Sequence, residues 1–304
     1  MCRRLRVDLK HARLSDFKVN GDDAVEYLIG GDLTRIGSDH DFHLSHTYAL
    51  SQLKWAEDRH SNFGSASLDL PPDHVYAVPG NHDHWKGITP LVKGNIPLRR
   101  PPAYNPMVFP DFLEATPWRH TLWSSSKAFA LELYGVDSNE GLKGKATNFR
   151  AGGQISPDEL KRLRQHLIET DYDRAADGKP RLKAIACHHA FSSNGGLADA
   201  WPLSNQSRQD LIDLARAYEV RAILTGHTHY FLDQKWQQPK QPIVWELRCG
   251  STLQRGKQPQ PQGFWAHEIS QTGDPLALKW SAWKYQWGGT QFLRNSAPVD
   301  VTVQ

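Results

Sequence analysis

The sequence predicts an α/β fold in which two mixed β-sheets pack face to face and are flanked by helices. Strand-like and helix-like patterns alternate over the first two thirds of the chain. Strand-like patterns then follow one another from about residue 240 to 290. In addition, four apolar runs each end in a short cluster of Gly, Asp, Asn or His. Open α/β sheets bind ligands at the carboxyl ends of their strands, so these clusters predict a functional site.

Short apolar runs bounded by glycine or turn residues are typical of buried strands. Four such runs precede the polar clusters, at about residues 27–29, 74–78, 182–187 and 222–224. We also expect a strand at about 128–136. The β-rich C-terminal part is predicted from three later segments, at about 243–248, 264–269 and 276–287.

Three segments carry the features of helices, at about residues 44–59, 156–168 and 207–218. The second is marked most clearly, because Ser156 can act as the N-cap and Pro157 occupies the first helical position. Glu159 stands where it would close a capping box. The third helix has leucine and isoleucine at helical spacing, so one of its faces is expected to be buried.

The stretch from about residue 85 to 126 contains seven prolines, too many for regular structure. Long loops beside a site are usually functional. We interpret this stretch as a cap or specificity insert, rather than a structural excursion, within a single domain that spans residues 1–304.

The composition is that of a soluble globular protein. A chain of 304 residues with 39% hydrophobic residues can bury a large core. The formal net charge of +3 is small, so a nucleotide or nucleic-acid substrate is compatible with the sequence but is not indicated by its charge. The three cysteines are scattered, the first residues lack a signal-peptide core, and no apolar run is long enough for a membrane span. We therefore expect a cytoplasmic protein without membrane contact, and its oligomeric state stays open.

The polar clusters carry side chains that bind metal ions. His227 and His229 are two positions apart, so on an extended segment both imidazoles lie on one side. Asp32 offers a carboxylate that can bridge two ions, Asn81 a carbonyl oxygen, and His188 another imidazole. Mixed nitrogen and oxygen ligands suit Zn²⁺, Mn²⁺ or Fe. Two ions about 3.5–4 Å apart can clamp a phosphoryl group for in-line attack, so the pattern predicts a metal-dependent hydrolase.

The chain resembles the calcineurin-like metallophosphoesterases in four motifs: Gly31-Asp32, Gly80-Asn81-His82-Asp83, His188 after an apolar run, and Gly226-His227-Thr228-His229. This resemblance covers about Tyr27 to His229. It implies a four-layer αββα sandwich with a dinuclear metal site at the strand ends. It also implies that a metal-bridging hydroxide attacks the phosphate ester.

The resemblance assigns a metal-binding role to five residues. Asp32 would bridge the two ions. Asn81, His188 and His227 would complete the site of the second ion, and His229 would belong to that of the first.

Two further residues would act without binding metal. By the same resemblance, His82 would stabilise charge and protonate the leaving oxygen, and Asp83 would orient His82. The family ligand directly follows its strand, so His188 is preferred over His189.

One part of the family pattern is not found. The family opens with a strand that ends in Asp-x-His and supplies two ligands to the first ion. Upstream of Asp32, the nearest matches are Asp8-Leu9-Lys10-His11 and Ser15-Asp16-Phe17-Lys18, and neither has His two positions after Asp. We therefore expect the opening strand to be absent, through a late start or a genuine loss.

The leading hypothesis is a hydrolase that uses two divalent ions to cleave phosphate esters. Diesters are favoured over monoesters as its substrates. The alternative is a degenerate, weakly active or non-catalytic member that binds a single ion and acts through partners, because the first metal-ligand motif is missing. Asp83 stands where the protein Ser/Thr phosphatases have Glu, which argues against that subclass. The physiological substrate would be selected by the insert and the β-rich tail.

Overall fold

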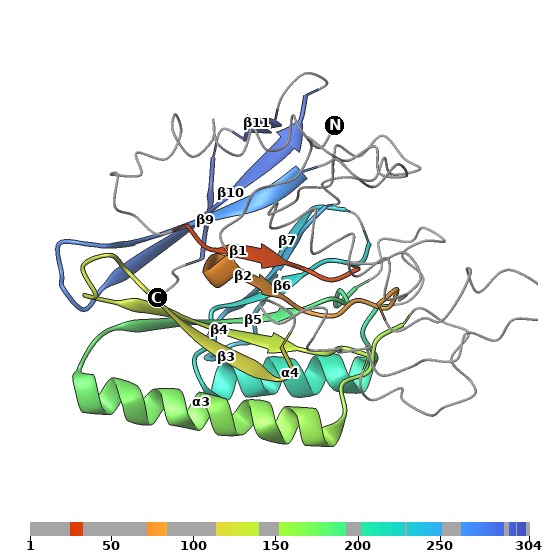
Figure 1. Ribbon diagram of the computed structural model, residues 1–304, viewed down its shortest axis with the longest axis horizontal. Coiled ribbons are helices and arrows are strands. Elements are labelled where there is room, and N and C mark those ends of the chain that lie inside the picture. The colour runs from red at the N-terminus through yellow and green to blue at the C-terminus, as the bar shows by residue number, and fades with distance from the viewer. Residues whose placement is uncertain are drawn as a thin grey trace, which may run out of the picture.

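A six-stranded mixed sheet runs through the centre of the computed structural model (Figure 1). Its strands lie in the order β3 (Trp118–Trp123), β4 (Ala130–Val136), β5 (Arg181–Cys187), β6 (Ala222–Thr225), β8 (Val244–Arg248) and β7 (Leu232–Trp236). Strands β4, β5, β6 and β8 are parallel, whereas β3 and β7 pair antiparallel at the two edges. The carboxyl ends of the four parallel strands therefore meet at one edge of the sheet. The structure describes residues 25–32, 72–83, 114–139, 152–192, 202–228, 230–250, 263–288, 292–295 and 297–301.

The remaining strands lie on one side of this sheet (Figure 1). Strand β1 (Tyr27–Ile29) pairs in parallel with β2 (Val75–Ala77), which follows the short 3-10 helix η3 (Pro72–His74). Strand β10 (Leu278–Trp287) pairs antiparallel with β9 (Gly263–Gln271), β11 (Phe292–Arg294) and β12 (Val299–Asp300). Buried side chains of β3, β4, β5, β6, β8 and β10 fill the space between the layers, and they include three tryptophans: Trp118, Trp245 and Trp280.

Helices α3 (Pro157–Asp177) and α4 (Asn205–Ala217) cover the opposite face of the six-stranded sheet (Figure 1). Strand β5 serves both cores because successive side chains point to opposite faces. Ile185 and Cys187 pack with the helices, and Ala184 and Ala186 pack with the second layer of strands. The predicted α/β sandwich is thus confirmed, while the helix expected at 44–59 lies outside the described residues. No helix within the described ranges is long and apolar enough to cross a membrane.

Helix α3 begins as predicted and continues about two turns beyond its expected end. Ser156 Oγ accepts the N–H of Glu159 at 3.1 Å, as an N-cap does. The buried Glu159 carboxylate is directed to the end of β4 instead of closing the capping box, and there it accepts the N–H of Asp137 at 3.0 Å. No glycine or proline interrupts the sequence after residue 168 until Gly178, whose φ of 67° ends the helix.

The stretch predicted to be irregular contains a strand at its C-terminal end. Strand β3 follows the last proline of this stretch, Pro117, and pairs along its whole length with β4. The prediction of irregular structure from the prolines therefore extended too far, since it included the residues of β3. Residues 84–113, the larger part of the proposed insert at 85–126, lie outside the described residues. Strand β7 also escaped prediction, because its side chains alternate between exposed and half-buried positions without an apolar run.

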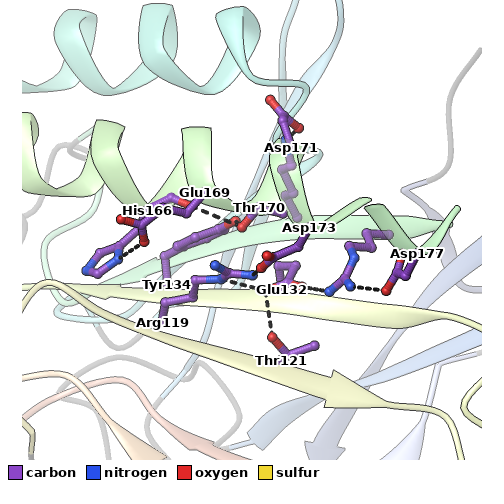
Figure 2. A network of polar contacts seen from close by, with 12 residues as sticks. Arg119, Thr121, Glu132, Tyr134, His166, Glu169, Thr170, Asp171, Asp173 and Asp177 are labelled. Carbon is purple, nitrogen blue, oxygen red and sulfur yellow. Dashed lines mark hydrogen bonds and ion pairs between the residues drawn. The ribbon is translucent and has the colours of Figure 1, made fainter. Parts of the chain in front are cut away.

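A buried carboxylate joins β3, β4 and β5 near the amino ends of the parallel strands (Figure 2). The Glu132 side chain is fully buried and accepts Arg119 Nε at 2.9 Å and Thr121 Oγ1 at 3.0 Å. Arg181, at the start of β5, pairs with its other oxygen. Arg119 also reaches Asp173 on α3, so the network connects the helix to the sheet. These charges lie at the sheet end opposite to the polar clusters.

Substitution of Gly135 is expected to cause a large loss of stability. Gly135 lies opposite Trp118 in the β3–β4 pair, and a Cβ atom there would be 1.9 Å from the Trp118 ring. The ring is held in place because its Nε1 donates to Ala77 O at 3.1 Å. We expect Gly135→Ala to lower the free energy of unfolding by about 3 kcal/mol, measured by urea denaturation. Gly273→Ala is the control, since nothing lies within 4 Å of its added Cβ. Equal stability of the Gly135→Ala variant and the parent would show that the ring is not packed on this strand.

The protein is expected to lose stability at mildly acidic pH because of His267. Burial lowers the pKa of His267 to about 4, and its Nδ1 accepts a hydrogen bond from Trp280 Nε1 at 3.1 Å. Below the ordinary His pKa of about 6.5, the unfolded chain binds a proton that the folded chain excludes. The contribution of His267 to stability is therefore complete above about pH 6.5 and is lost as the pH falls toward 4, by about 3 kcal/mol. His267→Gln should flatten this part of the stability profile; an unchanged profile would assign the acid sensitivity to other groups.

Candidate functional site

Four side chains from four strand ends meet at the edge where the parallel strands terminate. Asp32 follows β1, Asn81 follows β2, His188 follows β5 and His227 follows β6. Asn81 Oδ1 lies 2.9 Å from His188 Nε2 and 3.1 Å from His227 Nδ1. The two imidazole nitrogens are 3.1 Å apart, and Asp32 Oδ1 lies 3.4 Å from His188 Nε2. We call these four residues the donor cluster.

Glycines allow the strand ends to approach one another this closely. A Cβ atom at Gly80 would lie 2.2 Å from the backbone nitrogen of Asp32. One at Gly31, where φ is +96°, would lie 2.5 Å from His188 Nδ1. Any larger side chain at either position would therefore separate β1 from β2 or from His188.

Two members of the donor cluster adopt left-handed backbone conformations. Asp32 has a φ of 53° and His227 a φ of 67°. Non-glycine residues adopt positive φ only rarely, and such conformations gather at functional sites. The backbone here turns sharply directly after the strands, which directs both side chains across the sheet edge.

A backbone carbonyl determines which nitrogen of His188 faces the donor cluster. His188 Nδ1 lies 2.8 Å from Gly30 O. A carbonyl oxygen can only accept, so Nδ1 carries the proton and Nε2 presents its lone pair to the cluster. His188 is 2% exposed, so its ring is fixed in this orientation.

The Asp32 carboxylate is held in its ionised form. Burial raises the pKa of Asp32. The neighbouring His188, His82 and His227 together lower it by more than burial raises it, so the net pKa lies below the ordinary value. The backbone N–H of His82 donates to Asp32 Oδ1 at 3.0 Å and contributes to this shift. The cluster thus combines one carboxylate with two imidazoles and an amide oxygen.

Asp83 shapes the turn that carries Asn81 and His82. Its buried carboxylate accepts the N–H of Gly80 at 2.8 Å and so closes the turn on itself. His82 is half-buried at the edge of the cluster. The predicted role of Asp83 in orienting the His82 ring, and that of His82 toward substrate, stay predictions.

The two adjacent histidines after β5 point to different partners. His188 enters the donor cluster, whereas His189 Nδ1 lies 2.7 Å from Ser138 Oγ at the end of β4. Gly153 leaves room for the His189 ring. The structure thus brings His188, the residue preferred from the sequence, beside Asn81. His229 lies outside the described residues, as do Asp8, His11 and Asp16.

Counted over His, Cys, Asp and Glu alone, no group of three side chains in the described ranges could hold a metal ion. Asn81 is therefore central to the donor set, since its amide oxygen is the atom that contacts both imidazole nitrogens.

Two charged residues behind the cluster, Glu246 and Arg248 on β8, were not predicted from the sequence. Both side chains are fully buried. The available signal was two opposite charges, two positions apart, at the carboxyl end of a strand that is otherwise apolar.

Known proteins are similar to this chain in sequence profile and in fold. A profile of the family described as calcineurin-like phosphoesterase matches residues 11–231. No protein with a curated description matches the chain. Among solved structures, GAP50, described as the anchor in the inner membrane complex of Plasmodium, has 13% sequence identity and a TM-score of 0.55; the similarity covers 98% of this chain and 82% of GAP50. This score shows a shared fold.

Two further structures are similar over smaller parts. Vps29 from Entamoeba histolytica, complexed with zinc, has 13% identity and a TM-score of 0.23, with 56% of this chain and 99% of Vps29 covered. A hypothetical protein from Thermus thermophilus has 13% identity and a TM-score of 0.27, with 75% of this chain and 67% of that protein covered. Scores this low support no argument about fold or function.

Proposed function

Because this chain belongs to the calcineurin-like phosphoesterase family, we propose that it hydrolyses phosphate esters, diesters in preference, with divalent metal ions bound at the donor cluster. The family as a whole carries out metal-dependent hydrolysis of phosphate esters. The preference for diesters, the metals and the roles of individual residues are parts of the proposal.

The spacing of the donor atoms is the observation that supports it. Ligand atoms about 2.0–2.1 Å from a tetrahedral ion are about 3.3–3.4 Å from one another. The measured distances in the donor cluster run from 2.9 to 3.4 Å. Two imidazoles, an amide oxygen and a carboxylate form a donor set that suits Zn²⁺, Mn²⁺ or Fe. Asp32, Asn81, His188 and His227 would thus hold one ion, the second of the predicted pair, and the first ion would be bound by Asp32 and His229.

Each residue of the cluster has a separate task in this proposal. Asp32 supplies the negative charge, and Asn81 a neutral oxygen between the two imidazoles. Gly30 O keeps the proton of His188 away from the cluster, so that its Nε2 stays available as a donor. Bound divalent ions would polarise the phosphoryl group and offset its negative charge.

His82 would act on the leaving group. Its backbone N–H is bound to Asp32, so the residue is fixed beside the cluster, while its partly exposed imidazole can reach a bound ester. An imidazole can donate a proton to the departing oxygen as a general acid.

Hydrolysis of bis-p-nitrophenyl phosphate tests the proposal. We expect turnover in the presence of Mn²⁺, loss of turnover in excess EDTA, and recovery when Mn²⁺ is restored. p-Nitrophenyl phosphate, the monoester, should be hydrolysed more slowly. Failure of all three divalent ions, Mn²⁺, Zn²⁺ and Fe²⁺, to support either reaction would contradict the assignment.

One observation favours a second candidate function, namely a non-catalytic member that binds a single ion and acts through partners. Residues 1–31 contain no Asp-x-His, so of the ligands that the resemblance implies for the first ion, these are identified: Asp32 and His229. Catalytic zinc usually has three protein ligands. Metal analysis distinguishes the two candidates: two tightly bound ions with turnover support the enzyme, and one ion without turnover supports the second candidate.

A further inference from the structure

A buried ion pair lies directly behind the donor cluster. Glu246 and Arg248 are on β8, the strand next to β6, and Arg248 Nη2 donates to Glu246 Oε1 at 3.0 Å. Both side chains are fully buried. Replacing a buried ion pair by neutral side chains of similar size is often neutral or stabilising, so a gain in stability is a weak reason for placing a pair here.

The pair contacts the segments that carry two of the four donors. Glu246 Oε1 accepts the backbone N–H of Phe191 at 2.9 Å and Thr225 Oγ1 at 3.2 Å. Phe191 is three residues after His188, and Thr225 is two residues before His227. One carboxylate oxygen therefore joins the segment after β5 to the end of β6.

Arg248 makes a second set of bonds to the same two segments. Its Nη2 donates to Ser192 Oγ at 3.0 Å and its Nη1 to Thr228 Oγ1 at 3.4 Å. Thr228 directly follows His227. The planar guanidinium can hold both hydroxyls at once because its donors are fixed relative to one another. The backbone N–H of Gly226 also donates a hydrogen bond to His188 O at 3.0 Å, which connects the two segments directly.

We propose that Glu246 and Arg248 are positioning residues, which keep His188 and His227 at the separation that metal binding requires. This inference rests on the proposed function, since it concerns the same metal site. The two side chains do not touch the donor nitrogens. They act through the chain segments next to His188 and His227. Hydrogen bonds to charged groups are stronger than hydrogen bonds between neutral groups.

The test compares Mn²⁺ affinity, by isothermal titration calorimetry, with thermal stability measured in EDTA. The main variant is Glu246→Gln with Arg248→Met, which removes both charges together and so leaves neither buried alone. Glu132→Gln is the matched control, because it disturbs another fully buried carboxylate at the opposite end of the strands. Arg248→Lys keeps the charge pair but lacks the fork that reaches both hydroxyls.

We expect the double variant to stay folded and to bind Mn²⁺ about 10–100-fold more weakly, the usual effect of disturbing groups behind a metal site. Arg248→Lys should bind more tightly than the double variant and more weakly than the parent. Glu132→Gln should lose stability with unchanged Mn²⁺ affinity.

Parent-like Mn²⁺ affinity in the double variant would overturn the positioning role alone, provided that Asn81→Ala abolishes binding. A decrease that merely follows stability, and so appears equally in Glu132→Gln, would overturn it too. If the parent binds no Mn²⁺, or if Asn81→Ala binds as the parent does, the proposed metal site fails and the positioning role with it.

Discussion

Replacing His82 by alanine is expected to lower kcat for bis-p-nitrophenyl phosphate by about 10²–10⁴-fold, the usual effect of removing a general acid. Bound metal should stay unchanged. The reason is that His82 holds Asp32 through its backbone N–H, at 3.0 Å, and this bond survives the loss of the imidazole. The measurement is steady-state kinetics combined with metal analysis of the same preparation.

His74→Ala is the matched control for His82. His74 lies just before β2, whereas His82 follows that strand, and it pairs with Glu26 at 3.0 Å. Its removal should leave turnover unchanged. If His82→Ala and the parent turned over the diester equally fast, His82 would have no role in the reaction.

Asp32→Asn is expected to weaken metal binding and turnover together. Asp32 is the one carboxylate of the cluster. Two unit charges about 4 Å apart interact by about 4 kcal/mol at an effective dielectric constant of 20. We therefore expect Mn²⁺ affinity to fall by about 10³-fold. Asparagine tolerates positive φ, so the backbone at 53° is kept and the effect of charge is isolated.

Calorimetric titration with Mn²⁺ measures this effect directly. Asp213→Asn, on the exposed side of α4, serves as the charge-matched control and should bind as the parent does. Full metal occupancy in Asp32→Asn would place the ion away from the donor cluster.

The strands that lead into the site could be predicted because each is a short apolar run that stops at Gly or His. The run at 182–187 and the His that follows it are an example, and β5 ends at Cys187. The approach of these strand ends could not be predicted in detail. It depends on which strands pair, and β1 pairs with β2 across a long intervening segment.

The edge strands and the buried ion pair were beyond local patterns. Strand β3 mixes Trp, Arg, His and Thr, because one of its faces packs against a core while Arg119 pairs with Glu132. Glu246 and Arg248 could be seen as unusual in an apolar strand, but the segments that they join lie 20 or more residues away in the chain. Side chains that bind distant segments leave no periodic signal.

The donor cluster also joins segments that lie far apart in the chain. The hydrogen bond from His188 to Gly30 spans 158 residues, and the contacts of Asn81 with His188 and His227 span 107 and 146. Contacts between such distant residues close large loops and form late in folding. In the proposed metal site, an ion could therefore meet all four donors only after residue 227 has left the ribosome.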